Sequence, residues 1–287
     1  MRVLRGPLIT AVCMIGILAC VSIVLSRRND VGLLHVTFLD VGQGDATLIE
    51  SPTGTQVLID GGRGKMVLRP LSRTLGFFDR DIDMVVATHP DADHIGGLVD
   101  VLKRYRVRTI VMTENESDSP VYGAFKRAVQ NEGAQVVFAR TGEAFDLGRG
   151  ASGSTTLTIL FPDYDPRALE SNMSSIISRL TYGENEYLFT GDSPQAIEEY
   201  VVGMLGTELT SDVLKVGHHG SRTSSAESFV TTVHPAYAII SAGKDNSYGH
   251  PHKEVTDLFS AKGITQKNTA DEGSIFSVSD GATIWFR

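Results

Sequence analysis

The stretch VVATHPDADHIGGL, from Val85 to Leu98, decides how this chain folds and what chemistry it supports. Its centre, HPDADH, places two histidines and two aspartates within six residues. A helix start favours acidic residues because of the helix dipole, which would explain Asp91 and Asp93. It does not explain two histidines at this spacing. The stretch therefore predicts a metal site, with a capped helix start as the alternative.

The local backbone divides these ligands between two ions. Pro90 favours extended backbone at His89, and side chains two apart in an extended chain point the same way. We therefore expect His89 and Asp91 to serve one ion. Asp93 and His94 come next in the chain. A bend into a helix near Ile95 is expected to turn them towards a second ion.

Two later strand ends supply further candidates. EYLFTGD ends at Asp192, where a carboxylate can bridge two cations, although an aspartate before Ser-Pro also commonly caps a helix. DVLKVGHHGSRTSS, from Asp212 to Ser225, opens from an apolar strand into a histidine pair. One of the pair, His218, is expected to ligate a metal, while His219 orients it or contacts substrate.

A third candidate lies in NSYGHPH, from Asn246 to His252. His250 follows the strand candidate AYAIISAG and is expected to contact a phosphate or donate a proton. The alternative is a histidine that serves only the turn.

The N-terminal segment is almost wholly apolar from Gly6 to Ser26. It is long enough to cross the roughly 30 Å hydrocarbon core of a membrane as a helix. We expect residues 1–30 to form an uncleaved, single-pass anchor, with a cleaved signal peptide as the alternative, and residues 31–287 to form one domain. Arginines flank the segment on both sides, so charge orients it only weakly.

Cysteine content and charge restrict the other classes of site and partner. Both cysteines, Cys13 and Cys20, lie in the N-terminal segment, which excludes a disulfide framework or a thiolate metal site from the domain. The formal net charge is −8, although four arginines lie in that segment. General adhesion to nucleic acid is therefore not expected, because it depends on basic residues.

The order of the expected elements indicates an α+β fold. Short strands open each half of the chain, and helices alternate with strands later in each half. The stretch GRGASGSTT, from Gly148 to Thr156, is expected to be a loop. This order predicts two sheets with helices outside, and polar clusters where strands end.

Five motifs, in this order, resemble the metallo-β-lactamase superfamily: FLDVGQGDATLIES, THPDADHIGGL, YLFTGD, KVGHHGS and SAGKDNSYGHPH. More closely, they are similar to the hydrolase domain of the ComEC competence family, over about Leu33 to Arg287. The resemblance implies a four-layer αββα sandwich with two divalent metal ions at one edge of the sheets. It places the metal ligands at His89, Asp91, Asp93, His94, Asp192 and His218. It implies supporting or substrate-contacting positions at Asp45, His219, Ser221 and Asn172, and catalytic roles for Asp93 and His250.

The sequence departs from the wider superfamily at two positions. Asp91 replaces a histidine, as in the ComEC-like branch, and Asn172 to Ser175 occupy the stretch that usually carries another ligand histidine. One ion is thus expected to have more oxygen ligands, which moves preference from zinc towards manganese or magnesium. Zinc and manganese are the expected metals, with magnesium as an alternative.

The resemblance implies hydrolysis of phosphodiester bonds, and specifically a nuclease acting on DNA during its uptake outside the cell. The expected location is the cell membrane, with an extracytoplasmic domain, or secretion. Hydrolysis of another ester, a lactone or a β-lactam is a second hypothesis, and an inactive tethered binding module is a third. The sequence does not indicate an oligomeric state.

Overall fold

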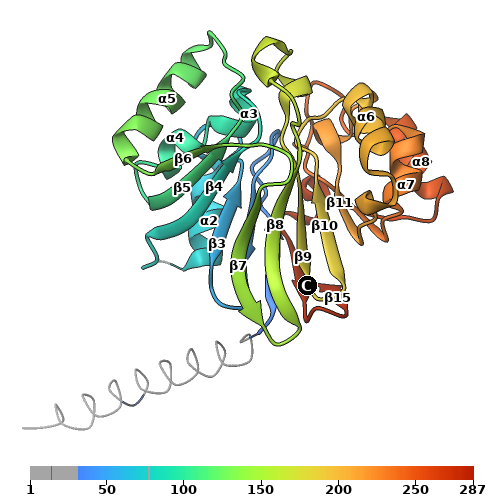
Figure 1. The fold of residues 1–287 in the computed structure, drawn as a ribbon, viewed down its shortest axis with the longest axis horizontal. Coiled ribbons are helices and arrows are strands. Elements are labelled where there is room, and N and C mark those ends of the chain that lie inside the picture. The colour runs from blue at the N-terminus through green and yellow to red at the C-terminus, as the bar shows by residue number, and fades with distance from the viewer. Residues whose placement is uncertain (1–13, 15–31, 77) are drawn as a thin grey trace, which may run out of the picture.

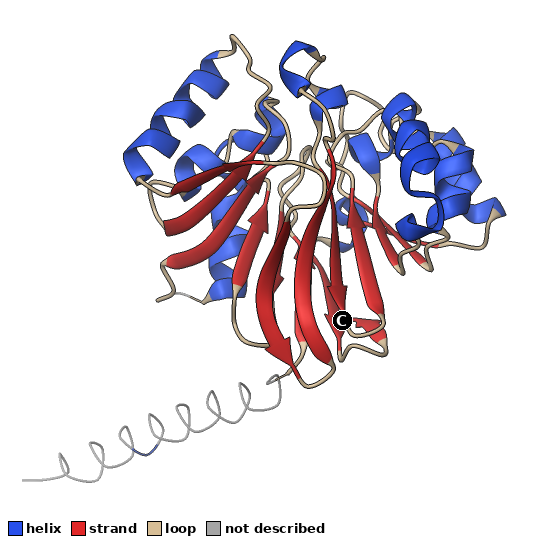
Figure 2. Cartoon of the chain, viewed as in Figure 1, coloured by secondary structure: helices blue, strands red, loops and turns tan. Residues whose placement is uncertain are grey.

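Two β-sheets pack face to face, and helices cover both outer faces, in the computed structural model of the protein (Figure 1). The structure describes Met14, residues 32–76 and residues 78–287. Apart from Met14, the expected membrane anchor at residues 1–30 lies outside this part of the chain. No helix in the described part is long and apolar enough to cross a membrane. The α+β sandwich expected for the domain is confirmed (Figure 2).

The first sheet has eight strands, in the order β15-β14-β1-β2-β3-β4-β5-β6. The pairs from β3 to β6 are parallel, whereas the other pairs are antiparallel. The last two strands of the chain therefore return to the sheet that the first strand opened. The strands are β1 (Leu34–Phe38), β2 (Thr47–Glu50), β3 (Gln56–Ile59), β4 (Asp81–Ala87), β5 (Arg106–Met112), β6 (Gln135–Phe138), β14 (Ile275–Ser279) and β15 (Ile284–Phe286).

The second sheet has seven strands, in the order β13-β12-β11-β10-β9-β8-β7. The pairs from β7 to β10 are antiparallel, and those from β10 to β13 are parallel. Each sheet thus joins an antiparallel part to a parallel part. The strands are β7 (Ala144–Gly150), β8 (Gly153–Phe161), β9 (Ile177–Tyr182), β10 (Asn185–Phe189), β11 (Val213–Lys215), β12 (Tyr237–Ile240) and β13 (Thr265–Asn268).

The helices divide between the two outer faces. Helices α2 to α5 cover the first sheet, and α6 to α8 cover the second. They are α2 (Leu68–Leu75), α3 (Ala92–Ile95), α4 (Leu98–Val101), α5 (Pro120–Glu132), α6 (Gln195–Leu205), α7 (Glu227–Val233), α8 (Lys253–Ala261) and α9 (Thr269–Glu272), with short 3₁₀ turns at Gly64–Val67, Pro166–Ala168, Asn172–Ser174, Gly206–Leu209 and Gly217–Gly220.

Strand alternation produces three apolar layers, because successive side chains of a strand point to opposite faces. In β2, Leu48 packs under the helices of the first sheet, whereas Ile49 packs between the sheets. In β10, Leu188 packs under the helices of the second sheet, whereas Tyr187 and Phe189 pack between the sheets. The sequences of strands with both faces buried are therefore continuous apolar runs, without alternation of polar and apolar residues.

Two details differ from the elements expected from the sequence. The Gly148 to Thr156 stretch reads as a loop, yet β7 and β8 enter it from both sides and leave only a tight hairpin turn. The helix expected near Ile95 begins already at Ala92, as α3, and a second short helix, α4, follows after Gly96 and Gly97. A Cβ at Gly97 would lie 1.9 Å from the carbonyl oxygen of Gly61, so only glycine allows this close approach.

Candidate metal centre

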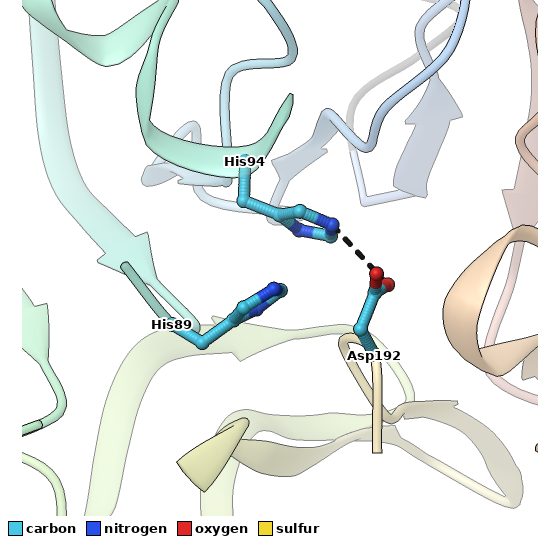
Figure 3. A group of neighbouring side chains, drawn as sticks. All are labelled: His89, His94 and Asp192. Carbon is cyan, nitrogen blue, oxygen red and sulfur yellow. Dashed lines mark ion pairs between the residues drawn. The ribbon is translucent and has the colours of Figure 1, made fainter. Parts of the chain in front are cut away.

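The loops after β4 and β10 bring three buried side chains together (Figure 3). His89 follows β4, His94 lies in α3, and Asp192 follows β10. One ligand atom from each lies within 4.8 Å of the others, and His94 Nε2 is 3.2 Å from Asp192 Oδ1. The first sheet thus supplies the two histidines and the second sheet supplies the carboxylate.

Asp60 and Thr88 orient the two histidines from behind. Asp60 Oδ2 lies 2.8 Å from His94 Nδ1, and Thr88 donates its hydroxyl to the same oxygen at 2.7 Å. Thr88 Oγ1 also lies 3.0 Å from His89 Nδ1. Because each Nδ1 is engaged, both Nε2 atoms are left for a ligand, as in carboxylate–histidine–metal arrangements. Asp60 directly follows β3, and its role was not predicted from the sequence.

Asp192 faces two groups of side chains. Its Oδ1 lies against His94, whereas its Oδ2 lies 3.5 Å from His219 Nε2 and 3.9 Å from His218 Nε2. Gly191, with a φ of 52°, allows the turn that presents it, and Ser175 Oγ accepts a hydrogen bond from the Asp192 amide. The two oxygens of Asp192 thus face different histidines, and its role as a bridge between two cations stays a prediction.

The histidine pair takes up the opposite arrangement from that expected. Both residues have positive φ, 48° at His218 and 55° at His219, so the chain turns sharply between them. The His219 ring is buried, and its Nε2 also lies 3.5 Å from Asp93 Oδ2. His219 therefore joins Asp93 and His94 in a second potential metal group, while the His218 ring is 28% exposed and its Nδ1 lies 3.0 Å from Thr223 Oγ1.

A buried ion pair supports His219 from beneath. Lys215, in β11, donates to Asp45 Oδ2 at 2.6 Å, and Asp45 Oδ1 lies 3.3 Å from His219 Nδ1. The His219 Nδ1 also lies 3.0 Å from the Ser241 carbonyl oxygen. Burial opposes ionisation of Asp45, but Lys215 and His219 hold its pKa below the ordinary value. Asp45 thus has the supporting position expected, whereas Lys215 was missed, although a lysine within the apolar run DVLKVG is a signal.

Two serine hydroxyls, one just before and one within the Asn172 to Ser175 stretch, contact two aspartates of the site. Ser171 Oγ donates to Asp91 Oδ1 at 2.6 Å, and Ser175 contacts Asp192 as described. Asp91 Oδ2 lies 3.8 Å from His89 Nε2, consistent with the expectation that these two residues share an ion. Asn172 Oδ1 is buried without a hydrogen-bond partner in the described chain.

A cavity of about 180 Å³ opens above these side chains. Ser221 is not among its lining residues; its hydroxyl accepts a hydrogen bond from Thr223 instead. Burial and the neighbouring histidines lower the pKa of His250 to about 4, so its ring is neutral at neutral pH. The lining residues are Gln43, Asp91, Asp93, Asp192, His218, His219, Tyr248 and His250.

The residues present fit metal ions. The Nε2 atoms of His89, His94 and His219 and the Oδ1 atom of Asp192 are all buried, and none has a hydrogen-bond partner within the described residues. Buried polar atoms in folded proteins almost always have partners, so this convergence of unsatisfied nitrogen and oxygen atoms requires an explanation. Imidazole and carboxylate suit zinc, manganese and iron. His94 belongs to both potential metal groups, and Asp192 also lies with Asp45 and His219 in a third one.

Comparisons with known proteins agree with this geometry. The chain is 30% identical to "ComE operon protein 3" of Bacillus subtilis over 260 residues, 84% of this chain and 32% of the relative. It is also 30% identical to "Competence protein ComA" of Neisseria gonorrhoeae over 243 residues, 84% of this chain and 31% of the relative. The chain thus spans about a third of the length of these relatives.

The same fold occurs in solved structures. The metallo-beta-lactamase fold protein YhfI from Bacillus subtilis superimposes with a TM-score of 0.53 at 12% identity, covering 82% of this chain and 95% of that one. The model of the "Metallo-beta-lactamase superfamily" matches residues 39–244, which include every residue of both metal groups. The chain belongs to the metallo-beta-lactamase superfamily and, within it, is a ComEC-like domain.

Proposed function

We propose that this chain is a metal-dependent phosphodiester hydrolase that acts on DNA. The observation that carries the proposal is the set of neighbouring ligand groups, linked through His94 and Asp192, beside an open cavity. The name of one relative, "Competence protein ComA", refers to competence, the uptake of DNA, which supports DNA as the substrate. We also propose that residues 1–30 anchor the domain to the outer face of the cell membrane.

The ligands divide between two positions. His89, Asp91 and Asp192 would hold one divalent ion, and Asp93, His94, His219 and Asp192 the other. Zinc or manganese is proposed, because imidazole and carboxylate are mixed at both positions. Two such ions supply Lewis acidity towards a phosphodiester and acidify a water molecule for attack.

The residues of the chain bind and orient the reactants. No lysine or arginine is among the residues that line the cavity in the described chain, so the protein itself offers no cation to a phosphate there. His250, whose ring centroid is 5.7 Å from that of His218 and whose pKa is lowered, would donate a hydrogen bond to an oxygen of the substrate. Asp60 and Thr88 would hold the His89 and His94 rings in one orientation during the reaction.

The test is cleavage of single- and double-stranded DNA by the full chain with manganese, zinc or magnesium. We expect metal-dependent cleavage that chelation abolishes and that Asp93→Ala reduces by at least 100-fold, as is common when a ligand of a catalytic metal is removed. A β-lactam, a lactone and a carboxylic ester form the comparison panel. Turnover of one of these without cleavage of any phosphodiester would overturn the proposal, and metal content below one equivalent would favour a binding module.

A further inference from the structure

An exposed aromatic ring stands at the mouth of the cavity. Tyr248 is 58% exposed, yet it lines the same cavity as Asp93 and Asp192. Its ring stacks on that of His250, with centroids 5.6 Å apart and planes 23° from parallel. One face of the ring is therefore covered by His250, and the large exposed fraction leaves the remainder open to solvent beside the metal centre.

The loop that carries this ring is held by side-chain hydrogen bonds. The Asn246 amide group donates to the carbonyl oxygens of Gly243 and His250, at 2.9 Å and 2.6 Å. Its Oδ1 accepts from the backbone N–H groups of Tyr248 and His250, at 3.2 Å and 3.0 Å. One asparagine thus fixes both aromatic residues relative to each other. The ring is therefore held at the rim of the cavity while more than half of its surface stays open to solvent.

A second contact ties the loop to the opposite sheet. Gln43, in the loop between β1 and β2, accepts from the Gly243 N–H at 3.0 Å through Oε1, and its Nε2 lies 3.4 Å from His250 Nδ1. Gln43 also lines the cavity. The position of the Tyr248 ring is therefore fixed relative to the β1–β2 loop that carries Asp45.

We propose that Tyr248 is a stacking platform for the nucleobase next to the phosphate that is cleaved. The inference rests on the proposed function. The cavity itself is small and lined by aspartates and histidines, which suit the phosphate through bound cations but offer little to a base. A base adjoining that phosphate must lie at the rim, where an aromatic face is available. Stacking on such a face tolerates any base, because every base has a π-surface.

The test compares two oligonucleotides of one length, one with normal bases and one with abasic tetrahydrofuran residues, which share the same phosphodiester backbone. Cleavage of each oligonucleotide is measured in the presence of manganese. Binding of each oligonucleotide is measured by fluorescence anisotropy in the presence of calcium. Tyr248→Ala is expected to raise KM and Kd for the normal oligonucleotide about tenfold or more, and to leave the abasic one unchanged. Tyr248→Phe keeps the ring and is expected to behave as the unmodified protein.

The matched control is Tyr200→Ala, since Tyr200 is also an exposed tyrosine but lies outside the cavity. This variant is expected to leave KM and Kd unchanged for both oligonucleotides. If Tyr248→Ala raises KM and Kd equally for both oligonucleotides, the stacking role is overturned. It is also overturned if Tyr248→Phe binds as weakly as Tyr248→Ala, because that result would assign the contact to the hydroxyl group. If the unmodified protein cleaves and binds neither oligonucleotide, the proposed function fails first and the inference fails with it.

Discussion

Lys215 and Asp45 form a buried ion pair, with 2.6 Å between Nζ and Oδ2, that joins β11 of the second sheet to the β1–β2 loop of the first. Lys215 also donates to the carbonyl oxygen of Val216. The pair lies directly beneath His219, so its integrity affects both the packing of the sheets and the orientation of a proposed metal ligand.

Removing one partner of this pair is expected to be more harmful than removing both. Lys215→Met leaves the Asp45 carboxylate buried without a counter-charge, and we expect a loss of about 3–5 kcal/mol in the free energy of unfolding. The double variant Lys215→Met/Asp45→Asn removes both charges and should recover much of that loss. Denaturant unfolding of the three proteins provides the measurement. Equal destabilisation of the single and double variants would show that the charge itself is unimportant.

His219 and His218 are expected to differ in their effect on metal content. His219→Ala removes a buried nitrogen that faces Asp93 and Asp192, so we expect the loss of about one bound equivalent. His218→Ala should keep both equivalents, because its ring is partly exposed and its Nδ1 is engaged with Thr223. Elemental analysis after dialysis, with circular dichroism as the check on folding, decides between them. The reverse pattern would restore the assignment expected from the sequence.

Ser171 is expected to act on metal binding through Asp91. Without its hydroxyl, Asp91 loses the hydrogen bond that fixes one of its oxygens, and its side chain is already 42% exposed. Loss of a residue that orients a ligand typically weakens metal binding by about 10- to 100-fold. We expect Ser171→Ala to show such a loss by titration calorimetry with manganese, and Ser171→Thr to retain affinity. Ser154→Ala, at an exposed serine, is the control, and a loss of the same size there would exclude a specific role.

Glu198 is expected to make stability depend on pH. It is buried in α6 and accepts hydrogen bonds from the N–H groups of Ser225 and Ala226, at the start of α7. Burial raises the pKa of its carboxyl from 4.5 to about 7, despite these two hydrogen bonds. Because the folded pKa is the higher one, the stabilisation is fully present below about pH 4.5 and is lost as pH rises through about 7.

The measurement is the difference in unfolding free energy between the unmodified protein and Glu198→Gln, taken from pH 4 to pH 8. Glutamine does not ionise, so the difference isolates this one carboxyl from other titrating groups. We expect the unmodified protein to lose about 3 kcal/mol relative to the variant across this range. A difference that is constant with pH would contradict the raised pKa.

The sequence predicted the two-sheet sandwich and most of the residues that come together at the metal site. This was possible because those residues lie in short motifs next to recognisable strands. His89, Asp91, Asp93 and His94 lie within one short stretch, and Asp192 follows a recognisable strand. The choice between His218 and His219 was not accessible, because both adopt positive φ and strand alternation does not apply there.

The contacts of the supporting residues could not be predicted, because their partners are distant in sequence. Lys215 and Asp45 are 170 positions apart, and Ser171 and Asp91 are 80 positions apart. Only the packing of one sheet on the other brings these pairs together. The Gly148 to Thr156 stretch was misjudged for a different reason, since its glycines and serines are typical of loops although antiparallel pairing extends through most of it.

The acidic lining of the cavity also determines the order in which its partners arrive. Asp91, Asp93 and Asp192 contribute negative charge at the cavity, which opposes entry of a phosphodiester, and two divalent cations would offset that charge. Nucleic acid should therefore enter only after the ions have bound. Metal supply would then act as a switch on substrate capture itself, so that a chelated protein would ignore DNA rather than hold it uncut.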